Sequence, residues 1–201
     1  MNYDLEMEKQ MSNLQEGSKL LLHACCAPCS SYCIEYLSNY FEITVFYYNP
    51  NIDTDLEYEK RVNELKRFVS EFKTKYPVHL VVLPHLQEEY LKEVVGLEDE
   101  PERGKRCLKC YELRLRKSFS YAKENNYDYI TTTLTLSPLK NSKVINEIGN
   151  KLEKEYDFKY LYSDFKKKEG YKRSIVLSRE YNLYRQDYCG CKYSKNKKIY
   201  D

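Results

Sequence analysis

The sequence predicts an α/β fold whose sheet is mainly parallel and is covered by helices on both faces. Short apolar runs of strand length alternate along the 201 residues with segments whose apolar residues recur at helical spacing. Parallel neighbouring strands need crossover connections, which such an alternation supplies. No internal repeat or low-complexity linker interrupts the pattern, so we expect a single catalytic α/β domain at residues 19–201 after an N-terminal extension at 1–18.

The strands are expected where apolar or β-branched runs stop at turn residues. Asn49-Pro50, Pro84 and Ser137-Pro138 end three of these runs. In chain order, the expected strands are residues 19–24, 42–48, 78–83, 127–134 and 158–162.

The helices are expected between the strands, where one face of a helix would be apolar. Val62, Leu65 and Val69 mark such a face in one segment, and Ile145 and Ile148 mark it in another. In chain order, the expected helices run from residue 30 or 31 to about 40, from about 55 to 72, from 87 to 95, through 111–122, through 145–152 and from 171 to 184.

The composition is that of a globular protein outside the membrane. Charged residues make up 32% of the chain, and no apolar run approaches the ~18 residues that a membrane span needs. Residues 1–18 have neither a basic start nor an apolar core, so they do not resemble a targeting signal, and we expect a cytoplasmic protein with no membrane partner. The net charge of +2 does not indicate a nucleic-acid binder, although basic residues gather at 166–168, 172–173 and 195–198.

Six of the eight cysteines form three close pairs. Eight cysteines are too few for a disulfide scaffold of this length, and a reducing compartment favours metal binding or redox chemistry. Cys25 and Cys26 follow the first strand, at the edge of a parallel sheet where ligands bind. Cys107 and Cys110 form a Cys-x-x-Cys motif at a helix start, where the helix dipole favours thiolates. Together these four thiols suit either zinc or a four-iron cluster.

The third pair, Cys189 and Cys191, remains after four ligands have been counted. It is suited to binding a second iron or to alternating between dithiol and a labile disulfide. The presence of a third pair favours redox chemistry. Redox chemistry is also favoured because adjacent cysteines are unusual in a zinc knuckle. Cys33 is expected in the core, whereas Cys29 stays undecided because it forms its own Cys-x-x-Cys motif with Cys26. His23 is expected to be a core residue, with a role beside the metal as the alternative.

Six blocks of sequence, distributed in order between residues 20 and 191, resemble the QueH family of epoxyqueuosine reductases. The blocks are LLLHACCAPCSSYCIEYL at 20–37, VFYYNPNI at 45–52, EYEKR at 57–61, RCLKCYELRL at 106–115, TTTLTLSP at 131–138 and FKKKEGYKRSIVLSREYNLYRQDYCGC at 165–191.

The resemblance implies a Rossmann-like fold of the HUP class, which includes PP-loop proteins. It also implies a 4Fe-4S cluster held by Cys25, Cys26, Cys107 and Cys110, and a redox-active or second-iron role for Cys189 and Cys191. Some members carry an aspartate at the position of Cys29. The implied reaction reduces epoxyqueuosine to queuosine at the tRNA wobble position.

This chemistry needs electrons, protons and an RNA-binding surface. The electrons must come from a donor that the sequence does not identify. Asp187 or Tyr188, beside the last cysteine pair, is the expected proton donor. The tRNA anticodon loop would be held by basic residues, for which the candidates are Lys166, Lys167, Lys168, Lys172, Arg173 and Arg185.

Two other functions fit part of the pattern. A tRNA thiolase of the PP-loop type would need a phosphate-binding loop rich in glycine after the first strand, and Cys25 to Cys29 occupy that place. A zinc-stabilised binding module without chemistry would need zinc alone. Analysis of the bound metal separates this module from the reductase.

Overall fold

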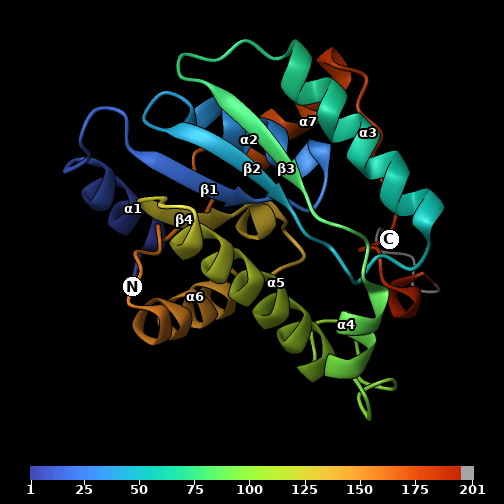
Figure 1. Cartoon of the computed structure of the whole chain (residues 1–201). Coiled ribbons are helices and arrows are strands. Elements are labelled where there is room, and N and C mark those ends of the chain that lie inside the picture. The colour runs from blue at the N-terminus through green and yellow to red at the C-terminus, as the bar shows by residue number, and fades with distance from the viewer. Residues whose placement is uncertain (196–201) are drawn as a thin grey trace.

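The computed structural model describes residues 1–195, and its centre is a four-stranded parallel sheet (Figure 1). The strands lie in the order β3-β2-β1-β4, and all pairs are parallel, which confirms the predicted sheet. The strands are β1 (Lys19–His23), β2 (Glu42–Tyr47), β3 (Val78–Val82) and β4 (Tyr129–Thr132).

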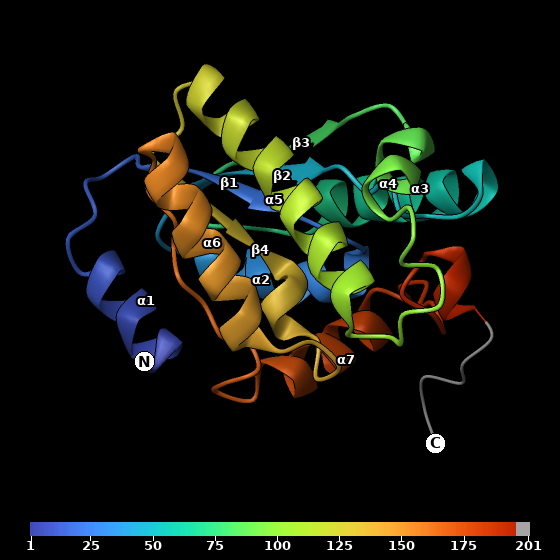
Figure 2. The same ribbon diagram turned by 90° about the horizontal axis from the view of Figure 1, so that it is seen from below.

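Helices cover both faces of the sheet, as predicted (Figure 2). One face carries α2 (Ala27–Leu37) and α3 (Asp55–Glu71), and the other carries α5 (Lys105–Glu124) and α6 (Ser142–Tyr156). Outside these layers, α7 (Gly170–Glu180) packs on α2. The shorter elements are α1 (Tyr3–Met11), α4 (Gln87–Glu93) and the 3₁₀ turns η1 (Thr133–Leu136) and η2 (Lys192–Ser194).

The alternation of side chains along β1 divides the core in two. Leu20 and Leu22 pack with α2 and α3, whereas Leu21 packs with α5 and α6. Successive side chains of a strand point to opposite faces, so one apolar run can fill both cores.

The strand order places a topological switch point between β1 and β4. The chain moves outward from β1 to β3 and then returns to place β4 on the other side of β1. Connections from neighbouring strands diverge to opposite faces at such a point, which leaves a crevice beyond the carboxyl ends of the strands. Cys25 follows β1 and Thr133 follows β4 at this edge.

The predicted fifth strand at residues 158–162 is reduced to one parallel bridge between Ile130 and Tyr160. The amide side chain of Gln10 replaces a further strand: its Nε2 donates to Tyr160 O (2.8 Å), and its Oε1 accepts from Tyr162 N (2.9 Å). This side chain belongs to α1, within residues 1–18. The N-terminal helix therefore covers the sheet edge beside Tyr160.

Three other predicted boundaries were wrong, two of them for identifiable local reasons. The strand expected at 127–134 ends at Thr132, because the Thr132 hydroxyl accepts from Leu134 N (3.2 Å) and starts η1. The helix expected from residue 30 or 31 begins at Ala27, since Pro28 lies in its first turn, where proline is tolerated. The expected helix at 171–184 ends at Glu180.

Within the described residues, every helix is too short or too polar to cross a membrane.

Candidate metal and substrate site

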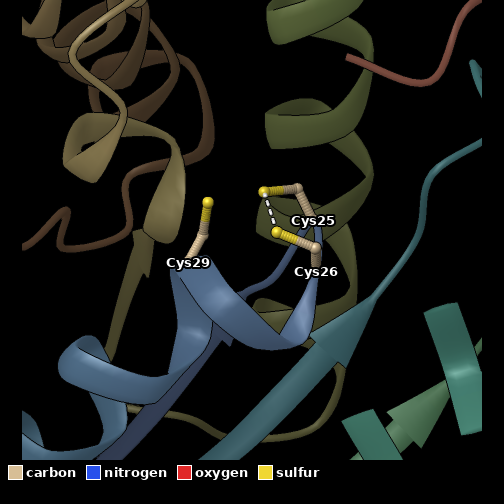
Figure 3. A group of neighbouring side chains, drawn as sticks. All are labelled: Cys25, Cys26 and Cys29. Carbon is tan, nitrogen blue, oxygen red and sulfur yellow. Dashed lines mark hydrogen bonds between the residues drawn. The ribbon is translucent and has the colours of Figure 1, made fainter. Parts of the chain in front are cut away.

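Three cysteines lie together at the start of α2. The sulfur atoms of Cys25, Cys26 and Cys29 all lie within 4.8 Å of one another, and those of Cys25 and Cys26 are 3.7 Å apart. Figure 3 shows the three side chains on the same side of the helix start. Cys25 and Cys26 belong to the turn after β1, and Cys29 belongs to the first turn of α2. Cys29, whose role the sequence left undecided, is therefore part of this sulfur group.

The three thiols shift one another's pKa values in opposite directions. Cys26 and Cys29 act as hydrogen-bond donors to Cys25, which holds the pKa of the Cys25 thiol well below its ordinary value. The same contacts raise the pKa of Cys26 to about 12 and that of Cys29 further above its usual range. Lys140 and Arg114 add positive charge near Cys25. A thiolate is the form of cysteine that binds metal.

A second group contains the other two cysteine pairs. Cys107 and Cys110 lie in the first two turns of α5, and they line one cavity together with Cys189 and Cys191. Burial raises the pKa of Cys110 to about 12, and Cys191 packs against Tyr90 and Cys110. The positive end of the α5 dipole is directed at this cavity.

Cys189 joins the two groups, because it lines this second cavity and also the first, which is lined by Cys25 and Cys29. Of the four ligands expected for a cluster, Cys25 lines the first cavity, Cys107 and Cys110 line the second, and Cys26 lies beside Cys25. Cys189 lies at the junction of the two cavities. Other described side chains that line the first cavity include Glu102, Arg114, Lys140, Tyr171, Arg185, Gln186 and Tyr188.

The segment that carries Cys189 is fixed from α3. Arg61, which is 2% exposed, donates from Nη1 to Cys189 O (3.3 Å) and from Nη2 to Tyr188 O (3.5 Å), and its Nε pairs with Glu57 (2.6 Å). Asp53 N donates to Gly190 O (2.9 Å). These contacts explain why the EYEKR block accompanies the last cysteine pair.

Gly190 is needed for the shape of this segment. Its φ is +122°, a region that other residues rarely adopt. A Cβ at this position would lie 3.1 Å from Arg61 Nη1 and 3.2 Å from Ile52 Cγ1. The glycine of the Cys-Gly-Cys motif therefore allows Arg61 to approach the backbone closely.

The comparisons with known proteins agree with this arrangement. The model of the family described as epoxyqueuosine reductase QueH matches residues 20–197. The chain belongs to the QueH family. It is 45% identical to the epoxyqueuosine reductase QueH of Streptococcus pyogenes serotype M1, over 96% of this chain and 78% of that protein. The corresponding proteins are 41% identical in Staphylococcus epidermidis, over 100% and 87% of the two chains, and 32% identical in Thermotoga maritima, over 87% and 89%.

The two expected proton donors occupy different surroundings in this QueH-family site. Tyr188 is 9% exposed and lines the first cavity, but its hydroxyl donates to Asp53 Oδ1 (2.7 Å), away from the sulfurs in the hydrogen-bond network. Asp187 is exposed and is not among the residues that line either cavity. Cys33 is fully buried in the core, as predicted.

The sequence did not indicate three buried polar side chains at the site. Arg114 and Asn49 are 1% and 2% exposed, and Asn49 Nδ2 donates to Ala24 O (2.9 Å), beside Cys25. Asn51 lines the second cavity and has a buried Oδ1 without a hydrogen-bond partner among the described residues. The sequence did contain a signal for the burial of Arg114. It lies three residues after Tyr111, so the two side chains share the apolar face of α5.

Proposed function

We propose that this protein reduces epoxyqueuosine to queuosine at the wobble position of tRNA, using a 4Fe-4S cluster bound at the junction of the two cavities. The observation that carries the proposal is the convergence of six cysteines, from three separate segments, on two cavities that share Cys189. Deoxygenation of an epoxide consumes two electrons and two protons and releases water, so a thiol-rich site at a ligand-binding edge suits the reaction.

The donor set fits the cluster. Cys25, Cys26, Cys107 and Cys110 are the proposed ligands, and Cys189 and Cys191 either bind an additional iron or cycle as dithiol and disulfide. A cluster with such a neighbour supplies electrons one at a time and an iron that polarises a C–O bond. Metal binding requires thiolates, so the raised pKa values of Cys26, Cys107 and Cys110 make binding at these ligands release protons.

The first cavity is the proposed substrate site. Its lining combines cations, Lys140 and Arg185, with one carboxylate among the described residues, Glu102. Lys140 is half-buried: burial opposes its charge, but the nearby sulfurs of Cys189 and Cys25 outweigh it and raise the pKa of the Lys140 ammonium. Lys140 can therefore hold an anionic or oxygen-bearing group of the substrate beside the sulfurs. Asp187 or Tyr188 remains the proposed proton donor.

The structure leaves fewer candidates for the proposed tRNA patch than the sequence did. Four of its residues pair with carboxylates: Lys166 with Asp164, Lys168 with Asp4 and Glu8, Lys172 with Glu169, and Arg173 with Glu35 and Glu180. Residues 196–198 of the last basic run lie outside the described part of the chain. Arg185 lines the first cavity, so it and Lys167 are the best placed for phosphate contacts.

The first test is anaerobic purification with iron, sulfide and zinc measured together, followed by an assay on tRNA that contains epoxyqueuosine and a chemical reductant in place of the unidentified electron donor. We expect a brown protein with about four or five irons, matching sulfide, and production of queuosine. The double variant Cys189→Ser/Cys191→Ser should retain much of the cluster and lose turnover, while Cys33→Ser is the control outside the site.

Two results would overturn the proposal. Stoichiometric zinc without sulfide, persisting after reconstitution with iron and sulfide, would favour a zinc-stabilised binding module. Full turnover by the double variant would remove Cys189 and Cys191 from the mechanism.

A further inference from the structure

Arg114 is a buried cation without a carboxylate partner. Its side chain is 1% exposed and ranks first by volume among the fully buried side chains of residues 1–195. Its three nitrogens face Asn49, His23 and Cys110: Nη2 donates to Asn49 Oδ1 (2.6 Å), Nε to His23 Nε2 (3.3 Å) and Nη1 to Cys110 Sγ (3.9 Å). All ion pairs within the described residues involve other side chains.

A guanidinium in such a place needs a negative charge nearby. An arginine keeps its proton at all accessible pH values, and an unpaired buried ion is strongly destabilising. The Asn49 amide is neutral, and His23 accepts the hydrogen bond of Arg114 Nε at Nε2, which requires a neutral imidazole. Among the three hydrogen-bond partners of Arg114, only the sulfur of Cys110 can carry a negative charge.

Arg114 stands between the two sulfur groups. It follows Cys110 by one turn of α5 and also lines the first cavity with Cys25 and Cys189. Through Asn49 it is linked to Ala24 O, and through His23 it is linked to Thr132 Oγ1 at the end of β4 (2.8 Å). Its hydrogen bonds therefore join α5, which carries Cys107 and Cys110, to the ends of β1 and β4, where Cys25 and Cys26 lie.

We propose that Arg114 is the counter-cation of the metal centre: its fixed positive charge stabilises the thiolates that hold the metal and makes the more negative, reduced state of the centre easier to reach. This inference rests on the proposed function. Arg114 is a positioning residue in this account, because it acts through the cysteines and not on the substrate.

Four variants separate charge from packing. Arg114→Met keeps much of the volume without charge, and Arg114→Lys keeps the charge without the planar fork. Asn49→Asp leaves Arg114 in place and gives it a carboxylate partner. Arg116→Gln is the control, because Arg116 lies on the same helix but is partly exposed and pairs with Glu112 and Glu155.

The measurements are the melting temperature before and after iron–sulfur reconstitution, and the reduction midpoint of the loaded protein. We expect loading to stabilise wild type and Arg116→Gln equally, and Arg114→Met and Asn49→Asp less. The midpoint should become more negative in Arg114→Met and Asn49→Asp, so that reduction is at least tenfold weaker, about 59 mV for one electron. Arg114→Lys should stay near the wild-type midpoint.

The inference is overturned if Arg114→Met lowers the melting temperature of metal-free and loaded protein equally and keeps the wild-type midpoint. If Arg114→Met does not fold, the Asn49→Asp comparison decides, and an unchanged midpoint there is equally contradictory. A wild type that binds only zinc would defeat the proposed function instead. The stabilisation by zinc, compared between wild type and Asn49→Asp, would then still test the role of Arg114.

Discussion

At the scale of single residues, Glu102 distinguishes substrate binding from metal binding. It is the carboxylate of the first cavity, it also lines the second cavity beside Cys107 and Cys189, and it forms no ion pair with another described residue. A polar side chain that contacts only the ligand contributes to binding without supporting the fold.

We therefore expect Glu102→Gln to raise the KM for modified tRNA about tenfold, equivalent to roughly 1.4 kcal/mol. Iron content and melting temperature should stay unchanged. Glu98→Gln, an exposed position in the same loop, is the matched control. Equal kinetics in both variants would show that Glu102 does not contact the substrate.

Cys33 and Arg114 show which features of the site could be predicted from the sequence and which could not. Cys33 was placed correctly because its spacing from Cys29 and its apolar neighbours fit a buried helix face. Arg114 was missed because an arginine is normally read as a solvated residue, even between Leu113 and Leu115. Only the three-dimensional positions of Asn49 and His23, from two other strand ends, reveal that it is buried and paired.

At the scale of elements, the Cys-Gly-Cys segment depends on its packing against α3. Replacement of Gly190 by alanine would impose an unfavourable φ and press a methyl group against Arg61 and Ile52. Because Arg61 also binds the carbonyl oxygens of Tyr188 and Cys189, the shift would move the cysteines themselves.

We expect Gly190→Ala to lower both the melting temperature and the turnover. The loss of stability should exceed the cost of backbone strain alone, which is about 1–3 kcal/mol. Gly96→Ala is the control, since its φ is also positive (+76°) but nothing lies within 4 Å of the added Cβ. If the two variants have equal melting temperatures and turnover, crowding at Gly190 is unimportant.

Element types were easier to predict than element ends. Apolar runs located the four strands, because β1, β2 and β4 are buried on both faces and the edge strand β3 is rich in β-branched residues. The end of β4 was missed because the Thr132 hydroxyl competes for a backbone amide, which an apolar pattern does not reveal. Residues 158–162 have strand-like sequence, but the Gln10 side chain, about 150 residues earlier, takes the hydrogen bonds of a further strand.

At the scale of the whole molecule, the N-terminal extension contributes to the core. Met7 and Met11 of α1 are 2% and 8% exposed and belong to the cluster that contains Leu20 and Phe41. The helix therefore contributes apolar contacts in addition to the hydrogen bonds of Gln10.

We expect Met7→Ala to lower the free energy of unfolding by about 2–5 kcal/mol, as is usual for a buried methionine. Leu5→Ala on the same helix is the control and should change little, because Leu5 is 58% exposed. Denaturant unfolding of the metal-free protein measures both. A loss below 0.5 kcal/mol for Met7→Ala would mean that the packing of α1 on the core contributes little to the free energy of unfolding.

The division of the sulfur ligands among distant segments also bears on biosynthesis. Cys25 and Cys26 leave the ribosome early, whereas Cys189 is the seventh of the eight cysteines in the chain. The junction of the two cavities needs Cys189, so it cannot close until nearly the whole chain has been translated and α3 has docked the final segment. The four proposed cluster ligands are therefore all translated before the last cysteine pair, and a nascent chain can present them before Cys189 and Cys191 complete the site.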